Sequence, residues 1–206
     1  MALLLLLLTA LSLQAQVAHQ HHPPRDAAEY LKVLNNPARD AWQKPHEVIQ
    51  ALALRPDEAI ADIGAGGGYF SRRFARHAGR VLAVDVDEKL LAATRQDAPP
   101  NLETVLASHD DPKLPPASVD TIFFCNVLHH IDGRPAYYER LARALRPGGR
   151  IVMMDFHKRE LPVGPPVRMK LSREEVVAEM KAAGFALEKE HDLLPHQYFL
   201  EFRRAQ

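Results

Sequence analysis

The residues with the clearest capacity for chemistry lie at the end of a short apolar run at 59–63. Asp62 belongs to this run, and the glycine-rich segment 64–68 (G-A-G-G-G) follows it directly. Because glycine lacks a Cβ atom, such a turn can adopt positive φ and let a ligand approach its N–H groups closely. A carboxylate just before the turn favours a ligand with a positive end and would repel a pyrophosphate. S-adenosylmethionine fits this pattern, since it has an ammonium group, a sulfonium and a ribose diol but no phosphate.

A second carboxylate, Asp85, ends the next apolar run, V-L-A-V-D. An acid at about this spacing after a glycine turn can accept hydrogen bonds from both hydroxyls of a ribose. The alternative role for Asp85 is a helix N-cap, which Asp87 can fill instead. Asp62 would receive the ammonium group, and 64–66 would run beneath the methionine end and the ribose. The expected cofactor contacts here are Asp62, Gly64, Ala65, Gly66, Asp85 and Val86.

Histidines follow two later apolar runs. His129 and His130 come after 119–126, and His157 comes after 151–155. A histidine near neutral pKa could deprotonate a phenol, an enol or an activated carbon acid. A base is needed only if the molecule that reacts must lose a proton. We expect His130 first and His157 second in that role; the alternative is that the 129–130 pair only hydrogen-bonds its own loop.

These residues need an alternating strand and helix framework to bring them together. The pattern predicts strands at 59–63, 80–84, 102–106, 119–126 and 151–155, with helices at 69–78, 88–96, 137–145 and 172–183. The carboxyl ends of parallel strands meet at one edge of a sheet, so the acids and histidines should share that edge. The last two predicted strands, 185–191 and 198–203, are joined by a link too short for a crossover helix, and must be antiparallel.

Local signals support several of the helix ends. Asp87 is placed to cap the helix at 88–96, and Ser172 to cap the helix that follows it. Gly184 comes just past the end of that second helix, where glycine is favoured. The sequence P-G-G at 147–149 is expected to close the helix at 137–145.

At this point the chain resembles the class I S-adenosylmethionine-dependent methyltransferases. The matching residues are D-I-G-A-G-G-G at 62–68, Asp85, and L-R-P-G-G-R at 145–150, within a resemblance that extends over 39–203. It is similar to a bacterial subgroup that begins with an export signal; the segments that carry this likeness are W-Q-K-P at 42–45, D-D-P-K-L-P-P at 110–116 and H-H-I at 129–131. The resemblance implies a Rossmann-like α/β fold, a seven-stranded methyltransferase sheet with an antiparallel last strand and helices on both faces. It also implies S-adenosyl-L-methionine as cofactor.

The resemblance further implies roles for residues outside the glycine turn. An acid in the loop after the third strand accepts from the adenine amino group, and Asp110 is the first choice among the consecutive His109, Asp110 and Asp111. Asn126 would line the pocket beside the methionine moiety. The N-terminal segment would lie over the cleft as a lid, in which Trp42 either covers bound ligand or packs in the core.

Composition and missing motifs narrow the acceptor. With a formal net charge of zero, no basic excess argues for nucleic acid as a partner. The single cysteine, Cys125, lies in an apolar run and reads as a buried inert thiol, so no thiol pair is present to hold arsenite. N-V-L-H at 126–129 stands where amide- and base-amino methyltransferases of this fold carry N-P-P-[FY]. A small-molecule acceptor is therefore favoured. The basic residues of 156–170 could favour an anionic substrate or could simply be solvated: Lys158, Arg159, Arg168 and Lys170.

The N-terminus predicts export. Residues 1–18 contain an apolar core too short to span a bilayer comfortably, and read as a secretory signal peptide. Residues 19–26 form a disordered His/Pro-rich linker, 27–58 the helical lid, and 59–206 the cofactor-binding domain. The expected location is the bacterial periplasm; an uncleaved membrane anchor and a misassigned start, which would make the protein cytoplasmic, are the alternatives. No metal site and no membrane span after signal cleavage are expected.

Two other functions remain open on this sequence. One is a nicotinamide-dependent oxidoreductase, since G-x-G-x-G with Asp85 passes a loose dinucleotide search. Asp62 and the antiparallel carboxyl end argue against it. The other is a non-catalytic protein that keeps the fold and binds S-adenosylmethionine, against which the intact glycine turn argues.

Overall fold

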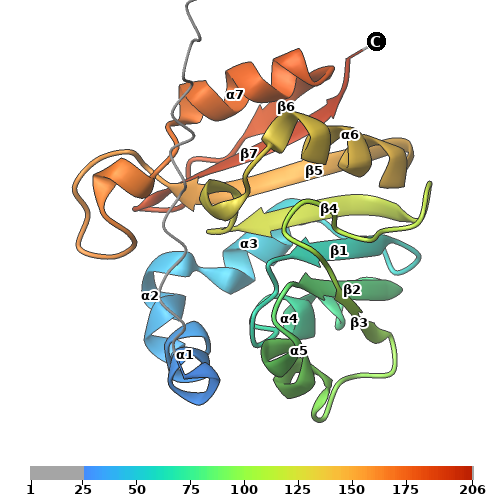
Figure 1. The fold of residues 1–206 in the computed structure, drawn as a ribbon, viewed down its shortest axis with the longest axis vertical. Coiled ribbons are helices and arrows are strands. Elements are labelled where there is room, and N and C mark those ends of the chain that lie inside the picture. Colours follow the sequence, from blue (N-terminus) through green and yellow to red (C-terminus); the bar gives the residue numbers. More distant parts are fainter. Residues whose placement is uncertain (1–25, 206) are drawn as a thin grey trace, which may run out of the picture.

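The computed structural model describes residues 26–205, so the predicted signal at 1–18 and nearly all of the predicted linker at 19–26 lie outside the described residues. The strands form one seven-stranded sheet in the order β3-β2-β1-β4-β5-β7-β6, and Figure 1 shows how they lie side by side. The strands are β1 (Ala59–Ile63), β2 (Arg80–Asp85), β3 (Leu102–Leu106), β4 (Val119–Cys125), β5 (Leu145–Phe156), β6 (Phe185–Glu190) and β7 (Gln197–Arg204). Strands β1 to β5 are parallel, and β7 runs antiparallel to both β5 and β6. The predicted α/β sheet with a reversed last strand is confirmed.

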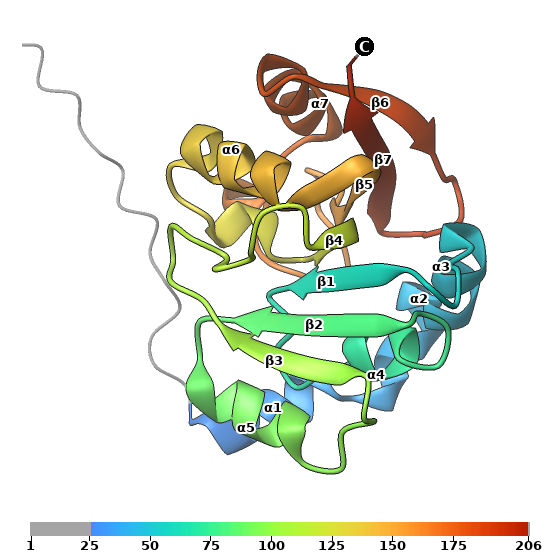
Figure 2. The same cartoon turned by 90° about the vertical axis from the view of Figure 1, so that its right-hand side faces the viewer.

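Helices cover both faces of the sheet (Figures 1 and 2). The α-helices are α1 (Ala27–Leu34), α2 (Asp40–Gln43), α3 (Pro45–Leu52), α4 (Ser71–Phe74), α5 (Glu88–Arg95), α6 (Arg134–Ala144) and α7 (Arg173–Ala182). Short 3-10 turns are η1 (Pro37–Arg39), η2 (Leu128–His130) and η3 (Val167–Met169). Residues of α6 and α7 share one apolar cluster with the sheet, and residues of α3 and α4 share the other. The central strand β1 is buried on both faces, which explains its uninterrupted apolar character.

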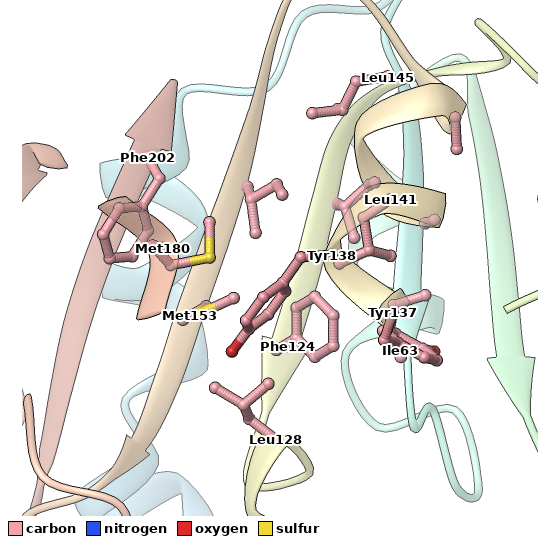
Figure 3. Close-up of a cluster of buried hydrophobic side chains, with 14 of the residues drawn as sticks. Ile63, Phe124, Leu128, Tyr137, Tyr138, Leu141, Leu145, Met153, Met180 and Phe202 are labelled. Atoms are coloured by element: carbon pink, nitrogen blue, oxygen red, sulfur yellow. The ribbon is translucent and has the colours of Figure 1, made fainter. Parts of the chain in front are cut away.

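Figure 3 shows the cluster on the α6 and α7 face, where Phe124 of β4 and Met153 of β5 meet Tyr138 of α6 and Met180 of α7. All four side chains are almost completely buried. Complete burial of a side chain of this size contributes about 1.5–3 kcal/mol. This packing holds α6 and α7 on one face of the sheet.

Two predicted boundaries are wrong. The helix predicted at 69–78 is only the single turn of α4. The chain after it forms a tighter turn, in which the N–H of His77 donates to the carbonyl of Phe74 (2.8 Å). P-G-G does not close α6, which ends at Ala144; it lies inside β5. There the register against β4 shifts between Val119 and Thr121, so the extra residues form a bulge instead of a helix stop.

The predicted helix caps are confirmed. The Asp87 carboxylate accepts from the N–H of Lys89 (2.8 Å), and Ser172 forms a reciprocal capping box with Glu175. Gly184, just past α7, has φ +82°. None of the helices within 26–205 is long and apolar enough to cross a bilayer.

Candidate active site

The turn between β1 and α4 is a left-handed glycine turn. Gly64, Gly66 and Gly68 have φ of +69°, +57° and +80°, values that favour glycine strongly. The N–H groups of Gly64 and Ala65 both donate to the carbonyl of Val84 in β2 (2.8 and 3.0 Å). The turn is thereby fixed to the neighbouring strand, above the edge where Asp62 and Asp85 end their strands.

The glycines also let other elements approach the turn. A Cβ at Gly64 would lie 2.4 Å from Val127, and one at Gly66 would lie 2.9 Å from Leu34 of α1. A Cβ at Gly67 would lie 2.7 Å from Leu31, also on α1. Figure 2 shows α1 beside α5 at this side of the sheet, and the two helices are in contact. The sequence explained these glycines by the approach of a ligand, whereas the structure shows that they also let α1 pack against the turn.

A cavity of about 620 Å³ opens above the turn. Its walls come from the glycine turn, from the ends of β2, β4 and β5, and from the N-terminal segment of α1, η1 and α2. Predicted site residues on the wall are Asp62, Gly64, Ala65, Gly66, Asp85, Val86, Asn126 and His130. Trp42 is also on the wall, with its ring 5.6 Å from that of Phe156. Trp42 therefore packs against an aromatic neighbour at the cavity wall, outside both buried apolar clusters, and its covering of a bound ligand stays a prediction.

Asp62 is the most strongly perturbed acid in the cavity. Its residue is only 3% exposed, and the hydroxyl of Ser71 donates to its Oδ2 (2.5 Å). Burial raises the pKa of Asp62 to about 7; the hydrogen bond from Ser71 opposes this rise, and the charge of Asp85 adds to it. A buried acid in this state gains most from a cationic partner, because a positive charge favours its ionised form.

Asp85 lies one strand away, at the carboxyl end of β2. Its Oδ2 accepts from the N–H of Gly66 (2.8 Å), and its Oδ1 accepts from the N–H of Asp87 (3.0 Å). Burial raises the pKa of Asp85, and these backbone hydrogen bonds oppose the rise. Each oxygen has further acceptor capacity, so the carboxylate is fixed in place and can still receive two hydroxyl groups.

A chain of buried amides supports the end of β4. The side chain of Gln197 donates to Oδ1 of Asn126 (2.6 Å), and Gln43 of α2 donates to Oε1 of Gln197 (3.0 Å). Gln43 also donates to the sulfur of Cys125 (3.0 Å), whose pKa burial raises to about 12. Cys125 is half-buried and lies on the cavity wall, so the prediction of a fully buried thiol is wrong, while its raised pKa favours the protonated, less reactive form. The amide chain connects the lid to the cavity wall.

Only one of the two candidate bases lines the cavity in the structure. His130 lines the cavity, but His157 does not; burial lowers the pKa of His157, and its ring lies 6.1 Å from that of Tyr198. His129 is buried, with Nδ1 2.9 Å from Oδ2 of Asp155 and its ring centroid 4.1 Å from that of His130. His129 thus holds the turn, and His130 is the histidine that a bound molecule can reach.

The sequence of this chain is similar to those of known methyltransferases. Residues 61–153 match the family model for a methyltransferase domain. A protein of Mycobacterium tuberculosis named probable S-adenosylmethionine-dependent methyltransferase is 30% identical over 152 residues, which cover 70% of this chain and 55% of the relative. A demethylmenaquinone methyltransferase of Tropheryma whipplei is 30% identical over 122 residues, covering 58% of this chain and 51% of the relative. The chain spans about half the length of these curated relatives.

Solved structures agree on the fold. A SAM-dependent methyltransferase from Aquifex aeolicus superimposes with a TM-score of 0.82 at 22% identity, over 88% of this chain and all of that chain. The DhpI–SAH complex superimposes with a TM-score of 0.61 at 20% identity, over 86% of this chain and 94% of that chain. Residues 61–153 are thus similar in sequence to a methyltransferase domain, and the described chain has the fold of the S-adenosylmethionine-dependent methyltransferases.

The donor set of this methyltransferase domain fits its cofactor. S-adenosylmethionine has a cationic amino-acid end and a ribose diol, and the cavity presents a buried acid for the first and a backbone-anchored acid for the second. Positive φ in the turn and the absence of Cβ atoms leave its backbone approachable. Within 26–205 no group of three or more His, Cys, Asp or Glu side chains is arranged to hold a metal ion.

Asp110, expected to contact the adenine, does not line the cavity of the methyltransferase domain. Its side chain is 74% exposed and pairs with Arg140 (3.7 Å), and the hydroxyl of Ser108 donates to it (2.9 Å). Ser108 and Asp111 exchange backbone hydrogen bonds (3.0 and 3.1 Å) in a tight turn; of the two residues between them, His109 faces the cavity and Asp110 is exposed. Ser108 and His109 take the place of Asp110 on the wall.

The basic loop after β5 does not bring its charges to the cavity. None of Lys158, Arg159, Arg168 and Lys170 is on the wall. Lys158 pairs with Glu175 (3.0 Å), and the buried Lys170 donates to the carbonyl of Arg159 (2.7 Å). The loop instead contributes Gly164, whose missing Cβ leaves room for the ring of Phe156 (2.8 Å). These contacts argue against the anionic substrate that the loop composition allowed.

Three residues with a part in the site carried no local signal in the sequence. Ser71 holds Asp62, Gln197 holds Asn126, and Arg39 lies on the cavity wall within the lid. Gln197 is 71 residues from Asn126 along the chain, so only the sheet register brings them together.

Proposed function

We propose that this domain transfers a methyl group from S-adenosylmethionine to a small-molecule acceptor that binds on the lid side of the cavity. The observation that carries the proposal is the composition of one continuous wall. The two acids and the glycine turn lie on one part of it, and Trp42, Phe156 and His130 lie on another. A cofactor and an acceptor can therefore share the cavity.

The cofactor is held by residues from four elements. Asp62 binds the ammonium group, and Asp85 binds the ribose hydroxyls. Gly64, Ala65 and Gly66 run beneath the methionine end and the ribose, and Asn126 lines the methionine side. Val86, Ser108 and His109 lie on the wall beyond Asp85 and suit the adenine. A charge-assisted hydrogen bond such as that of Asp62 contributes about 1.5–3 kcal/mol.

When bound, the cofactor supplies a methyl group activated by a sulfonium. The protein contributes alignment, which is worth up to about 7–11 kcal/mol when two reactants are held in reacting geometry. His130 is the general base if the acceptor must lose a proton. The acceptor side carries two aromatic rings and none of the loop cations, so a neutral phenol, enol or activated carbon acid fits better than an anion. Demethylmenaquinone, named for the Tropheryma whipplei relative, is one compound to test.

The experiment has a binding arm and a turnover arm. Calorimetry with S-adenosylhomocysteine and with NAD should give heat for the first ligand alone. The purified protein is then incubated with methyl-labelled S-adenosylmethionine and a panel of phenols, quinols and extract fractions, and a labelled product is expected. Binding without any labelled product would favour the non-catalytic alternative.

His130→Gln tests the base. Loss of a general base typically costs about 100- to 10,000-fold in rate, and we expect a loss in this range with little change in S-adenosylhomocysteine affinity. His157→Gln is the matched control, since His157 lies off the cavity wall. Equal losses in both variants would contradict the assignment of His130.

We also propose that residues 1–18 are a secretory signal and that the protein belongs to an exported bacterial subgroup. The support is the short apolar core followed by small and polar residues. Expression of the full chain in a bacterium, followed by fractionation and N-terminal sequencing, should recover a periplasmic form that begins after residue 15 or 18. Recovery of the intact N-terminus in the cytoplasm would contradict the proposal.

A further inference from the structure

A buried carboxylate lies behind the histidine that lines the cavity. Asp155, in the last turn of β5 before the loop, is only 1% exposed, and its two oxygens are bound to different groups. Oδ2 lies 2.9 Å from Nδ1 of His129, and Oδ1 accepts from the N–H of Phe156 (2.8 Å). A carboxylate only accepts hydrogen bonds, so the hydrogen of the first contact belongs to Nδ1 of His129. Asp155 thereby fixes both the orientation of this imidazole and the position of its proton.

The charge of Asp155 is not balanced by an arginine or a lysine. Within 26–205 the only basic side chain that pairs with it is His129. On the next strand Tyr198 lies directly opposite Asp155, and its buried hydroxyl has no hydrogen-bond partner among the described residues. A buried charge without a partner is costly, so a positive charge that forms beside this pair is favoured.

His129 transmits this effect to the cavity. Its ring centroid lies 4.1 Å from that of His130, and of the two histidines only His130 is on the cavity wall. Two imidazoles this close repel each other when both are charged, so one added proton is favoured over two. His130 is the member of the stack that can take this proton from a molecule in the cavity.

Other titratable groups surround the stack without replacing Asp155 in this role. On the side of the sheet core, Glu175 and Glu179 have their own cations, Lys158 and Arg134. The remaining groups on that side are Cys125, Tyr138 and His157. On the cavity side the charged or titratable side chains include Arg39, Asp62, Asp85, Asp87, His109 and Tyr137. All of these stay the same when Asp155 alone is changed.

We propose that Asp155 is a positioning residue for the base: it holds His129 against His130, and its negative charge stabilises the proton that His130 takes from the acceptor. The inference rests on the proposed function and assigns the buried pair behind the base a part in it. The proton of the acceptor passes to His130, and the electron pair of the broken bond stays on the acceptor atom. That atom bonds to the methyl carbon as the carbon–sulfur bond breaks, and the sulfur keeps the electron pair of that bond as a thioether.

The test follows the titration of His130 by NMR, which needs no turnover. Asp155→Asn keeps the size of the side chain and removes its charge. The protonated imidazole loses a stabilising negative charge, so the pKa of His130 should fall by about one unit. With a methyl acceptor in hand, the acid limb of the pH dependence of kcat/KM should move to lower pH by the same amount. An unchanged or raised pKa of His130 would overturn the inference.

Glu179→Gln is the matched control. It also removes a carboxylate on the α6 and α7 face, but Glu179 pairs with Arg134 (2.7 Å) and accepts from the hydroxyl of Tyr138 (2.9 Å). The pKa of His130 should therefore be that of the wild type in this variant. Equal shifts in both variants would show a general effect of a lost charge and would overturn the role of Asp155.

A measurement on the wild type decides the case in which Asp155→Asn does not fold. Nitrogen NMR shifts of His129 should show a proton on Nδ1 throughout the pH range in which the protein is folded. A neutral His129 with its proton on Nε2 would overturn the inference. A His130 pKa that falls as expected in a protein that transfers no methyl group would support the link to Asp155 and overturn the proposed function.

Discussion

At the scale of single residues, the ionisation of Asp62 controls the cofactor end of the cavity. Burial raises the pKa of this carboxyl to about 7, so without ligand it is largely protonated below neutral pH. An ammonium group binds the ionised form, and binding in acid must release a proton. We expect affinity for S-adenosylhomocysteine to rise from pH 5 to pH 8. Calorimetry in buffers of different ionisation enthalpy should detect the released proton, and Asp62→Asn should abolish this dependence. A flat profile in the wild type would contradict the prediction.

The same residue costs stability in the absence of ligand. Between pH 3.8 and about 7 the folded protein keeps a proton on Asp62 that the unfolded chain releases, so stability falls as pH rises through this window. Asp62→Asn keeps the acceptor for Ser71 without the charge. It should raise the free energy of unfolding at pH 8 by up to about 4 kcal/mol and much less at pH 4.5, measured by urea denaturation. An equal effect at both pH values would show that the cause is not ionisation.

The sequence predicted the acids that belong to a local motif. Asp62 and Asp85 follow from the spacing of strand ends around a glycine turn, and both lie on the cavity wall. Asp110 and His157 were also predicted as site residues, but they do not lie on the cavity wall. The direction of a loop side chain depends on its turn geometry and on distant packing, which the sequence does not give. Ser71 was missed because its contact with Asp62 depends on how α4 packs against β1.

At the scale of elements, the contact between α1 and the glycine turn holds α1 in place over the turn. Gly67→Ala should displace α1, because the added Cβ would meet Leu31 and Asn35 at 2.7 and 2.6 Å. These contacts are the far ends of side chains, so we expect a small loss of global stability, weaker S-adenosylhomocysteine binding and faster hydrogen exchange in 27–35.

Leu31→Ala gives this prediction its control. The double variant Gly67→Ala with Leu31→Ala restores space beneath the helix and should recover part of the lost affinity, a coupling expected only for residues in contact. Strictly additive losses would show that the two positions act independently and that Gly67 does not seat the lid.

The elements were easier to predict than their ends. Strong apolar periodicity predicted the core strands and helices, and the capping residues Asp87 and Ser172 predicted where two helices start. The segment 145–150 misled the prediction, because proline and glycine terminate helices and also permit bulges. Which of the two forms depends on β4, whose residues Val119 and Thr121 set the register.

At the scale of the whole molecule, the predicted binding residues and a buried ionic network lie at opposite ends of the strands. The carboxyl ends of β1, β2 and β4 carry the site, and the opposite edge carries a buried ionic network. There Arg150 pairs with Glu201 (2.9 Å) and Glu58 (3.5 Å), and His191 Nε2 lies 2.5 Å from Glu201 Oε1. This network connects β5, β7 and His191, just past β6, to the start of β1, while no member of it lies on the cavity wall.

Arg150→Met tests this separation. The variant removes the cation between Glu58 and Glu201, which are buried at 2% and 4% exposure and keep Arg55 (3.5 Å) and His191 (2.5 Å) as their remaining basic partners. Removal of one partner from a buried ion pair typically costs about 3–5 kcal/mol. We expect a loss of this size in the free energy of unfolding by urea denaturation. Under native conditions, affinity for S-adenosylhomocysteine should stay within about 3-fold of the wild type, because the binding edge is intact. Arg80→Ala, which breaks the exposed pair with Glu103, is the control and should cost less than about 1 kcal/mol. If Arg150→Met destabilised the fold no more than Arg80→Ala, or weakened binding in proportion to the lost stability, the two edges would not be independent.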